Sequence, residues 1–167
     1  TQLKSYTFSD KKLEWRRLLI AYTLAENQTA PNFKNLQAYS RRYLKNKETA
    51  QLYQLQATKY LMQGQLDSAL ILSDQAVQIA KRSAGSWTLI NALQAQAEIF
   101  WQANLLDKAV QRAIFSLQLA EEAKLPYFKI RPLVLISAIS LEVGNNEQTI
   151  AITHGRAINS CHPIRKS

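Results

Sequence analysis

The 167-residue chain contains few of the residues on which many folds depend: one cysteine, four glycines and four prolines. The single cysteine, Cys161, excludes a disulfide within the chain, which fits a reducing compartment. An all-β fold needs many glycine- and proline-rich turns, and this sequence holds too few of them. No apolar run approaches the roughly 20 residues of a membrane-spanning helix. We therefore expect no transmembrane segment and a cytoplasmic location, with a periplasmic one left open.

The sequence also lacks the common motifs of catalysis. It has no G-x-S-x-G elbow, no glycine-rich phosphate loop and no H-E-x-x-H. His154, Cys161 and His162 could supply at most three zinc ligands, and neighbours in sequence point apart on a helix. We therefore expect no enzymatic activity, no metal site and no cofactor.

What the sequence does contain is typical of a helical, globular protein. Hydrophobic residues make up 47% of the chain and charged residues 20%. Alanine, leucine and glutamine are abundant, and all three favour helices. The length suits one domain. We predict an all-α domain over residues 1–160 with a C-terminal tail over 161–167.

An internal repeat organises this helical sequence. YLMQGQLDSAL at 60–70 is echoed by FWQANLLDKAV at 100–110 and, more weakly, by SLEVGNNEQTI at 140–150. Gly64, Asn104 and Gly144 stand forty residues apart at the corresponding positions. Self-similarity with a period of about 20–50 residues indicates a solenoid. The alternative is an irregular helical bundle in which the echo is a coincidence.

Each copy has apolar residues at spacings of three and four on both sides of a central break, which predicts a helix, a tight turn and a second helix. Pro132 would remove a backbone donor inside the seventh helix, so this helix should start near Arg131 or be kinked. The helices expected are 10–26, 32–45, 48–63, 66–83, 87–103, 106–123, 128–143 and 146–159.

The arrangement of Tyr53, Ala57, Tyr60, Gly64, Ala69 and Ala76 resembles the tetratricopeptide repeat, as does the opening spacing of Trp15, Leu18, Leu19 and Tyr22. The forty-residue length resembles the repeats attached to bacterial transcriptional regulators and signalling proteins. The resemblance implies a right-handed α-α superhelix of about four hairpins that binds a protein or peptide and catalyses nothing. The third copy departs from the pattern at Ser137, Ser140, Thr149 and Arg156, so we expect it to pack loosely or to act as a cap.

The resemblance also implies that the first helix of each hairpin lines a concave groove. Amide side chains there could bind a peptide main chain, and Trp101 could act as an apolar anchor. The alternatives are solvated surface for the glutamines and a core position between hairpins for Trp101, while Phe100 belongs to the core stripe. The other residues at the phase of the groove are Leu13, Ile20, Thr23, Leu61, Val134, Ala138 and Leu141. The predicted groove residues are Arg16, Gln51, Gln54, Thr58, Asn91, Gln94, Glu98, Trp101 and Arg131.

The positive charge is unevenly distributed along the chain. The net charge is +9, and residues 1–60 hold eleven Lys and Arg against four acidic residues. Such asymmetry indicates an anionic partner, so a basic helical-repeat platform for nucleic acid is the second choice of function. The simpler reading is a solvated helix end whose cations favour the helix dipole. Homo-oligomerisation is left open. The candidate patch consists of Lys34, Arg41, Arg42, Lys45 and Lys47.

Overall fold

The computed structural model describes residues 8–24, 32–83 and 85–144, and every regular element within these ranges is a helix. The all-α prediction is therefore confirmed for this part of the chain. The expected helix at 146–159 lies outside the described residues, as do Thr149, His154, Arg156, Cys161, His162 and the tail at 161–167. The elements are α1 (Phe8–Leu24), α2 (Phe33–Tyr43), α3 (Asn46–Met62), α4 (Leu66–Lys81), α5 (Ser86–Gln102), α6 (Leu106–Glu122), the 3₁₀ helix η1 (Pro126–Lys129) and α7 (Ile130–Glu142).

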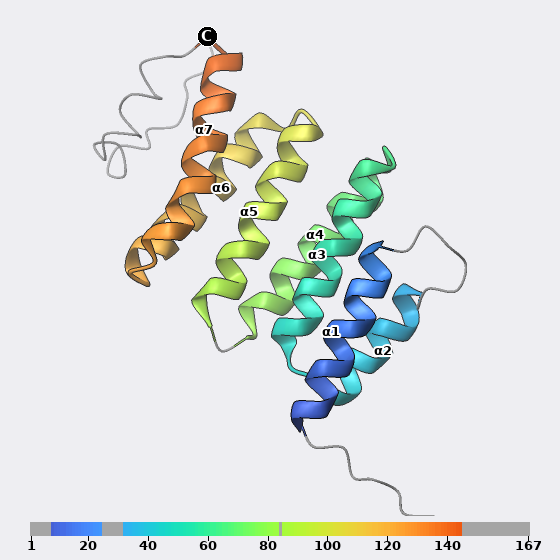
Figure 1. Cartoon of the computed structure of the whole chain (residues 1–167). Coiled ribbons are helices and arrows are strands. Elements are labelled where there is room, and N and C mark those ends of the chain that lie inside the picture. Colours follow the sequence, from blue (N-terminus) through green and yellow to red (C-terminus); the bar gives the residue numbers. More distant parts are fainter. Residues whose placement is uncertain (1–7, 25–31, 84, 145–167) are drawn as a thin grey trace, which may run out of the picture.

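The helices stack in chain order, each packing mainly on its neighbours in sequence. The helix α5 also packs on α3 and on α7, so the odd-numbered helices form a row with the even-numbered helices behind them (Figure 1). Lys59 extends this row to α1, because its ammonium group donates to the Tyr22 carbonyl and lies 3.9 Å from the centroid of the Tyr22 ring. Burial, with a smaller effect of Tyr60, raises the pKa of Tyr22 to about 12, so Lys59 contacts a neutral phenol.

The hydrophobic core runs along the stack as a series of clusters. The first joins α1, α2 and α3 through Trp15, Tyr22, Leu36 and Leu52. The last joins α5, α6 and α7. Alanines that are fully buried, such as Ala57, Ala69, Ala97, Ala109 and Ala113, let the helices of each hairpin approach closely. Each hairpin therefore depends on its neighbours rather than on one central core.

The hairpin turns explain the forty-residue spacing. Gly64, Asn104 and Gly144 follow α3, α5 and α7, with φ angles of 73°, 57° and 73°. The backbone N–H of the following residue closes the turn. Gln65 donates to the Tyr60 carbonyl and Leu105 to the Phe100 carbonyl, both at 2.8 Å. These bonds, six residues back to one, are those of the Schellman motif. The repeat thus marks equivalent helix ends, where glycine or asparagine tolerates a left-handed backbone.

Lys124 takes the same left-handed conformation after α6, with φ of 55°, and nothing in the sequence pattern predicts this. A residue with a Cβ pays roughly 1–2 kcal/mol in this region. Lys124→Gly should therefore raise the free energy of unfolding by roughly 0.5–1 kcal/mol, and Gly64→Ala should lower it by about 1 kcal/mol. A Cβ at Gly64 would meet no atom within 4 Å, so the cost there comes from the backbone alone. Urea denaturation of both variants tests this, and a stabilising Gly64→Ala would contradict it.

Pro132 lies in the first turn of α7, which begins at Ile130 immediately after η1. The first amides of a helix have no partner within it, so proline is tolerated there. Of the two expectations for this helix, the start near Arg131 is confirmed. Among the described helices, none has both the length and the apolar character needed to span a bilayer.

Candidate functional site

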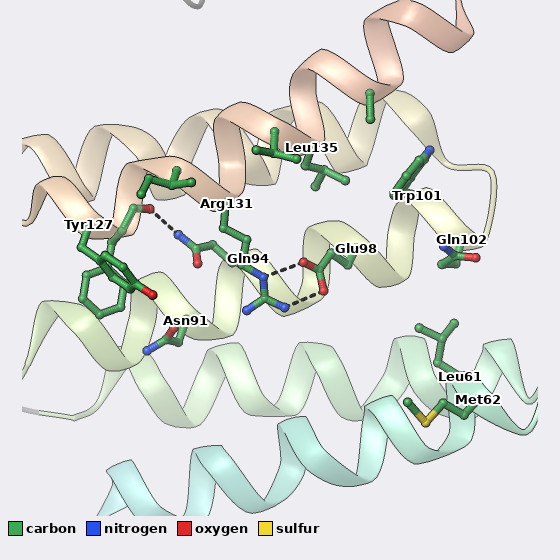
Figure 2. Close-up of a pocket in the computed structure, with 14 residues that line it drawn as sticks. Leu61, Met62, Asn91, Gln94, Glu98, Trp101, Gln102, Tyr127, Arg131 and Leu135 are labelled. Atoms are coloured by element: carbon green, nitrogen blue, oxygen red, sulfur yellow. Dashed lines mark hydrogen bonds and ion pairs between the residues drawn. The ribbon is translucent and has the colours of Figure 1, made fainter.

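A cleft of about 880 Å³ lies between the C-terminal end of α3, one face of α5, and η1 with α7 (Figure 2). Its floor is α5, whose residues Asn91, Gln94, Glu98 and Trp101 follow the three- and four-residue spacing of one helical face. One wall is Arg131, Val134, Leu135 and Ala138 of α7, and the other is Leu61 and Met62 of α3. The structure thus brings together Asn91, Gln94, Glu98, Trp101 and Arg131 from the predicted groove.

Gln94 has a structural task that the sequence does not reveal. Its side chain is only 3% exposed, and its amide nitrogen donates to the Phe128 carbonyl at 2.7 Å. This bond fastens η1 onto α5, as the dashed line in Figure 2 shows. The alternative of a solvated surface amide is therefore wrong for Gln94, whereas its contact with a peptide main chain stays a prediction. The carbonyl comes from 34 residues along the chain, so helical spacing alone cannot predict the bond.

Glu98 and Arg131 form a two-bond ion pair between α5 and α7. The Nε and Nη2 atoms of Arg131 donate to the two carboxylate oxygens of Glu98, each at 2.6 Å. The Arg131 side chain remains 50% exposed and that of Glu98 37%, so solvent screening leaves the pair little net stabilising effect. The Nη1 group of Arg131 and the outer lone pairs of Glu98 remain available. The pair therefore offers a donor and an acceptor side by side where the floor of the cleft meets the α7 wall.

Trp101 is both a lining residue of the cleft and a packing residue. Its ring packs against the core cluster of α5, α6 and α7, and its Nε1 donates to Glu142 Oε2 at 2.8 Å. Trp101 is half-buried, so its packing against the core agrees with the core alternative, and its role as a groove anchor stays a prediction. Because the indole N–H already has a partner, any contribution to binding must come from the ring.

The cleft is rimmed by exposed apolar side chains, several of which sequence reasoning missed. Met62 is 82% exposed, Tyr127 80%, Val134 63% and Ile130 57%. Clustered exposed apolar residues with polar neighbours are a mark of interaction surfaces. Val134 was at the predicted phase, whereas Tyr127 and Ile130 depend on the turn geometry of η1. Met62 closes α3 just before the Gly64 turn, and that helix end could have suggested its position.

The remaining predicted groove residues do not line the cleft. Gln54 has a buried amide nitrogen that lacks a hydrogen-bond partner within the described structure, and Thr58 donates to the Gln54 carbonyl at 3.1 Å within α3. Gln51 is half-buried, and Arg16 is exposed on α1. The expectation that Gln54 and Gln94 share one wall with Trp101 is therefore wrong for Gln54. The cleft occupies the C-terminal half of the expected groove.

The structure divides the candidate basic patch. Arg41 and Arg42 lie in the last turn of α2, and Lys45 and Lys47 lie at the start of α3. Lys34 is in the first turn of α2, roughly 10 Å away along the helix axis. Placing Lys34 in the same patch is therefore wrong, because the two ends of α2 lie on opposite edges of the stack.

No family model, no curated protein and no solved structure matches this chain. Within the ranges 8–24, 32–83 and 85–144, no group of His, Cys, Asp or Glu could hold a metal ion.

Proposed function

We propose that this chain is a non-catalytic helical-repeat module that binds a segment of a partner protein in the cleft between α3, α5 and α7. One observation carries the proposal: exposed Met62, Tyr127 and Val134 surround the Glu98–Arg131 pair. Buried apolar side chains dominate the energy of protein interfaces, and a few placed polar groups fix orientation. A peptide supplies both kinds of group, since its side chains are interleaved with main-chain amides and carbonyls.

The occupant should present one or two large apolar side chains beside an accessible stretch of main chain. The apolar side chains would lie against Trp101 and Val134. The outer oxygen lone pairs of Glu98 would accept a main-chain N–H, and Arg131 Nη1 would donate to a carbonyl. A small molecule fits less well, because such ligands are usually 70–90% buried, and two walls of this cleft are themselves largely exposed.

The tetratricopeptide-like architecture is part of the same proposal. Equivalent turns forty residues apart and packing between neighbouring helices support a right-handed solenoid of about four hairpins within a single domain at 1–160. The forty-residue repeat supports a place as the interaction or regulatory part of a larger cytoplasmic bacterial signalling or transcription-regulatory protein.

A pair of matched variants tests the cleft. A random peptide library panned against the purified chain should yield peptides whose affinity falls at least about tenfold in Val134→Asp, because a carboxylate would be desolvated on binding. Ile71→Asp is the control, since Ile71 of α4 is outside the cleft and is 60% exposed, close to the 63% of Val134. Fluorescence anisotropy measures both affinities. Equal affinity of the selected peptides for the two variants would place binding elsewhere.

A further inference from the structure

A second surface, separate from the cleft, gathers cations from four helices. Consecutive helices run in opposite directions, so alternate helix ends lie on the same edge of the stack. The lower edge in Figure 1 is formed by the start of α1, the end of α2, the start of α3 and the end of α4. This basic edge includes cations that the sequence patch did not contain, and it excludes Lys34. It consists of Lys11, Arg41, Arg42, Lys45, Lys47, Lys81 and Arg82.

Specific contacts hold the basic edge together. Lys11 Nζ lies 4.8 Å and Arg42 Cζ 5.2 Å from the centroid of the Tyr43 ring, so one aromatic side chain gathers cations from α1 and α2. Lys47 Nζ lies 4.1 Å from the Trp87 centroid and joins α3 to the start of α5. Rings that hold cations in this way position the charges without neutralising them.

Two hydrogen bonds complete the edge. Arg41 Nη2 donates to the Tyr53 hydroxyl at 3.2 Å, which ties the end of α2 to α3. Asn46 Nδ2 donates to the Arg82 carbonyl at 3.0 Å, which ties the start of α3 to the end of α4. The basic edge is therefore a continuous, supported surface rather than a set of unrelated side chains.

Helix stability explains only part of this charge. Arg41, Arg42 and Lys81 lie at helix C-termini, where the dipole favours cations. Lys45 and Lys47 lie at the start of α3, where the dipole disfavours them, and the Lys45 side chain makes no capping bond. The ion pairs that the structure describes have Arg17, Lys129 and Arg131 as their cations, none of which belongs to the basic edge. Glu48 in the same turn offsets only one of these two charges, so the dipole leaves the remaining positive charge at the start of α3 unexplained.

We propose that the basic edge binds the phosphate backbone of a nucleic acid. The chain has a net charge of +9 and a pI of about 9.8, which is typical of nucleic-acid-binding domains. Cations already cover the Tyr43 and Trp87 rings, so the edge presents charge rather than faces for base stacking, and recognition is independent of sequence. Membrane binding needs exposed apolar anchors, whereas Tyr43, Leu44 and Trp87 between the cations are half-buried.

Fluorescence anisotropy with a mixed-sequence RNA strand of about 20 nucleotides tests this site. If about four phosphates are contacted, affinity should fall roughly 50-fold between about 50 and about 200 mM salt. Arg42→Glu/Lys45→Glu should weaken binding at least about tenfold, and Arg42→Gln/Lys45→Gln should lie between this pair and the wild type. The control Lys34→Glu/Lys108→Glu changes the net charge equally. Both residues lie in the first turns of their helices, on the opposite edge of the stack, so this variant should lose much less RNA affinity.

Two competitors and one cleft variant decide the remaining outcomes. Polyglutamate and phosphatidylserine vesicles should displace the RNA poorly at equal charge concentration, and Val134→Asp should bind RNA like the wild type. Equal losses in the two double-glutamate variants would overturn the proposal, because net charge alone would then explain binding. Stronger binding to polyglutamate or to the vesicles would assign the basic edge to an acidic protein or to a membrane instead. Melting curves confirm that each variant is folded.

Discussion

Replacing Phe100 with alanine should lower the free energy of unfolding by about 3–5 kcal/mol, the usual cost of emptying a large aromatic site in a core. Phe100 is only 8% exposed and joins Ala97, Ala109 and Ile136 in the cluster between α5, α6 and α7. Domains are typically stable by only 5–15 kcal/mol, so this loss would leave the chain marginal. Chemical denaturation followed by circular dichroism measures it.

Phe115→Ala is the matched control. Phe115 lies on α6 and is 39% exposed, so its loss should cost about 1 kcal/mol or less. Because the core is a series of clusters, Phe100→Ala should speed amide hydrogen exchange mainly in α5–α7. Amides of the first cluster, around Trp15 and Leu52, should stay better protected. Equal costs for Phe100→Ala and Phe115→Ala would mean that the α5–α7 cluster is not a core.

Replacing Trp101 with alanine should reduce peptide affinity strongly and stability less than Phe100→Ala does. We expect affinity for a cleft-binding peptide to fall about 30-fold, equivalent to roughly 2 kcal/mol, as for an aromatic hot spot. Stability should fall less than in Phe100→Ala, because the Trp101 ring is only half-buried and its hydrogen bond to Glu142 is worth about 1 kcal/mol. Calorimetric titration and melting of the same variant give both quantities.

Trp101→Phe and Tyr127→Ala separate the contributions. Trp101→Phe removes the Nε1 donor, which bonds Glu142, but keeps most of the ring. Affinity should therefore be largely preserved. The second removes a side chain that is 80% exposed, so it should weaken binding without lowering the melting temperature. A Trp101→Ala variant that melts as early as Phe100→Ala and binds peptide normally would assign Trp101 to the core alone.

The helices and their turns could be predicted because local signals specify them. Apolar residues at spacings of three and four outlined the helices, and Gly64 and Asn104 marked left-handed helix ends that proved equivalent. The phase of α5 could be predicted for the same reason. Asn91, Gln94, Glu98 and Trp101 all line one cleft, since positions on one face of a single helix follow from its geometry.

What could not be predicted depends on contacts between distant segments. The bond from Gln94 to the Phe128 carbonyl requires η1, a turn that packs on α6 and α7 and is not specified by helical spacing. Lys34 was grouped with Arg41 because they are close in sequence, yet α2 separates them along its axis. Conversely, Lys11 and Arg82 joined the basic edge only because antiparallel helices bring their ends together.

The cleft is the central claim, and the methyl group of Met62 reports on it most directly. Met62 is the single methionine of the 167 residues and is 82% exposed at the cleft wall, so methyl labelling places one NMR signal there, assigned by its loss in Met62→Leu. Trp15, buried in the first cluster, supplies an indole reference that does not line the cleft. On titration with a selected peptide, the Met62 methyl and the Trp101 indole signals should shift with one saturation curve while the Trp15 indole stays fixed. Saturable peptide binding that leaves both Met62 and Trp101 unchanged would contradict the assignment of the cleft as the binding site.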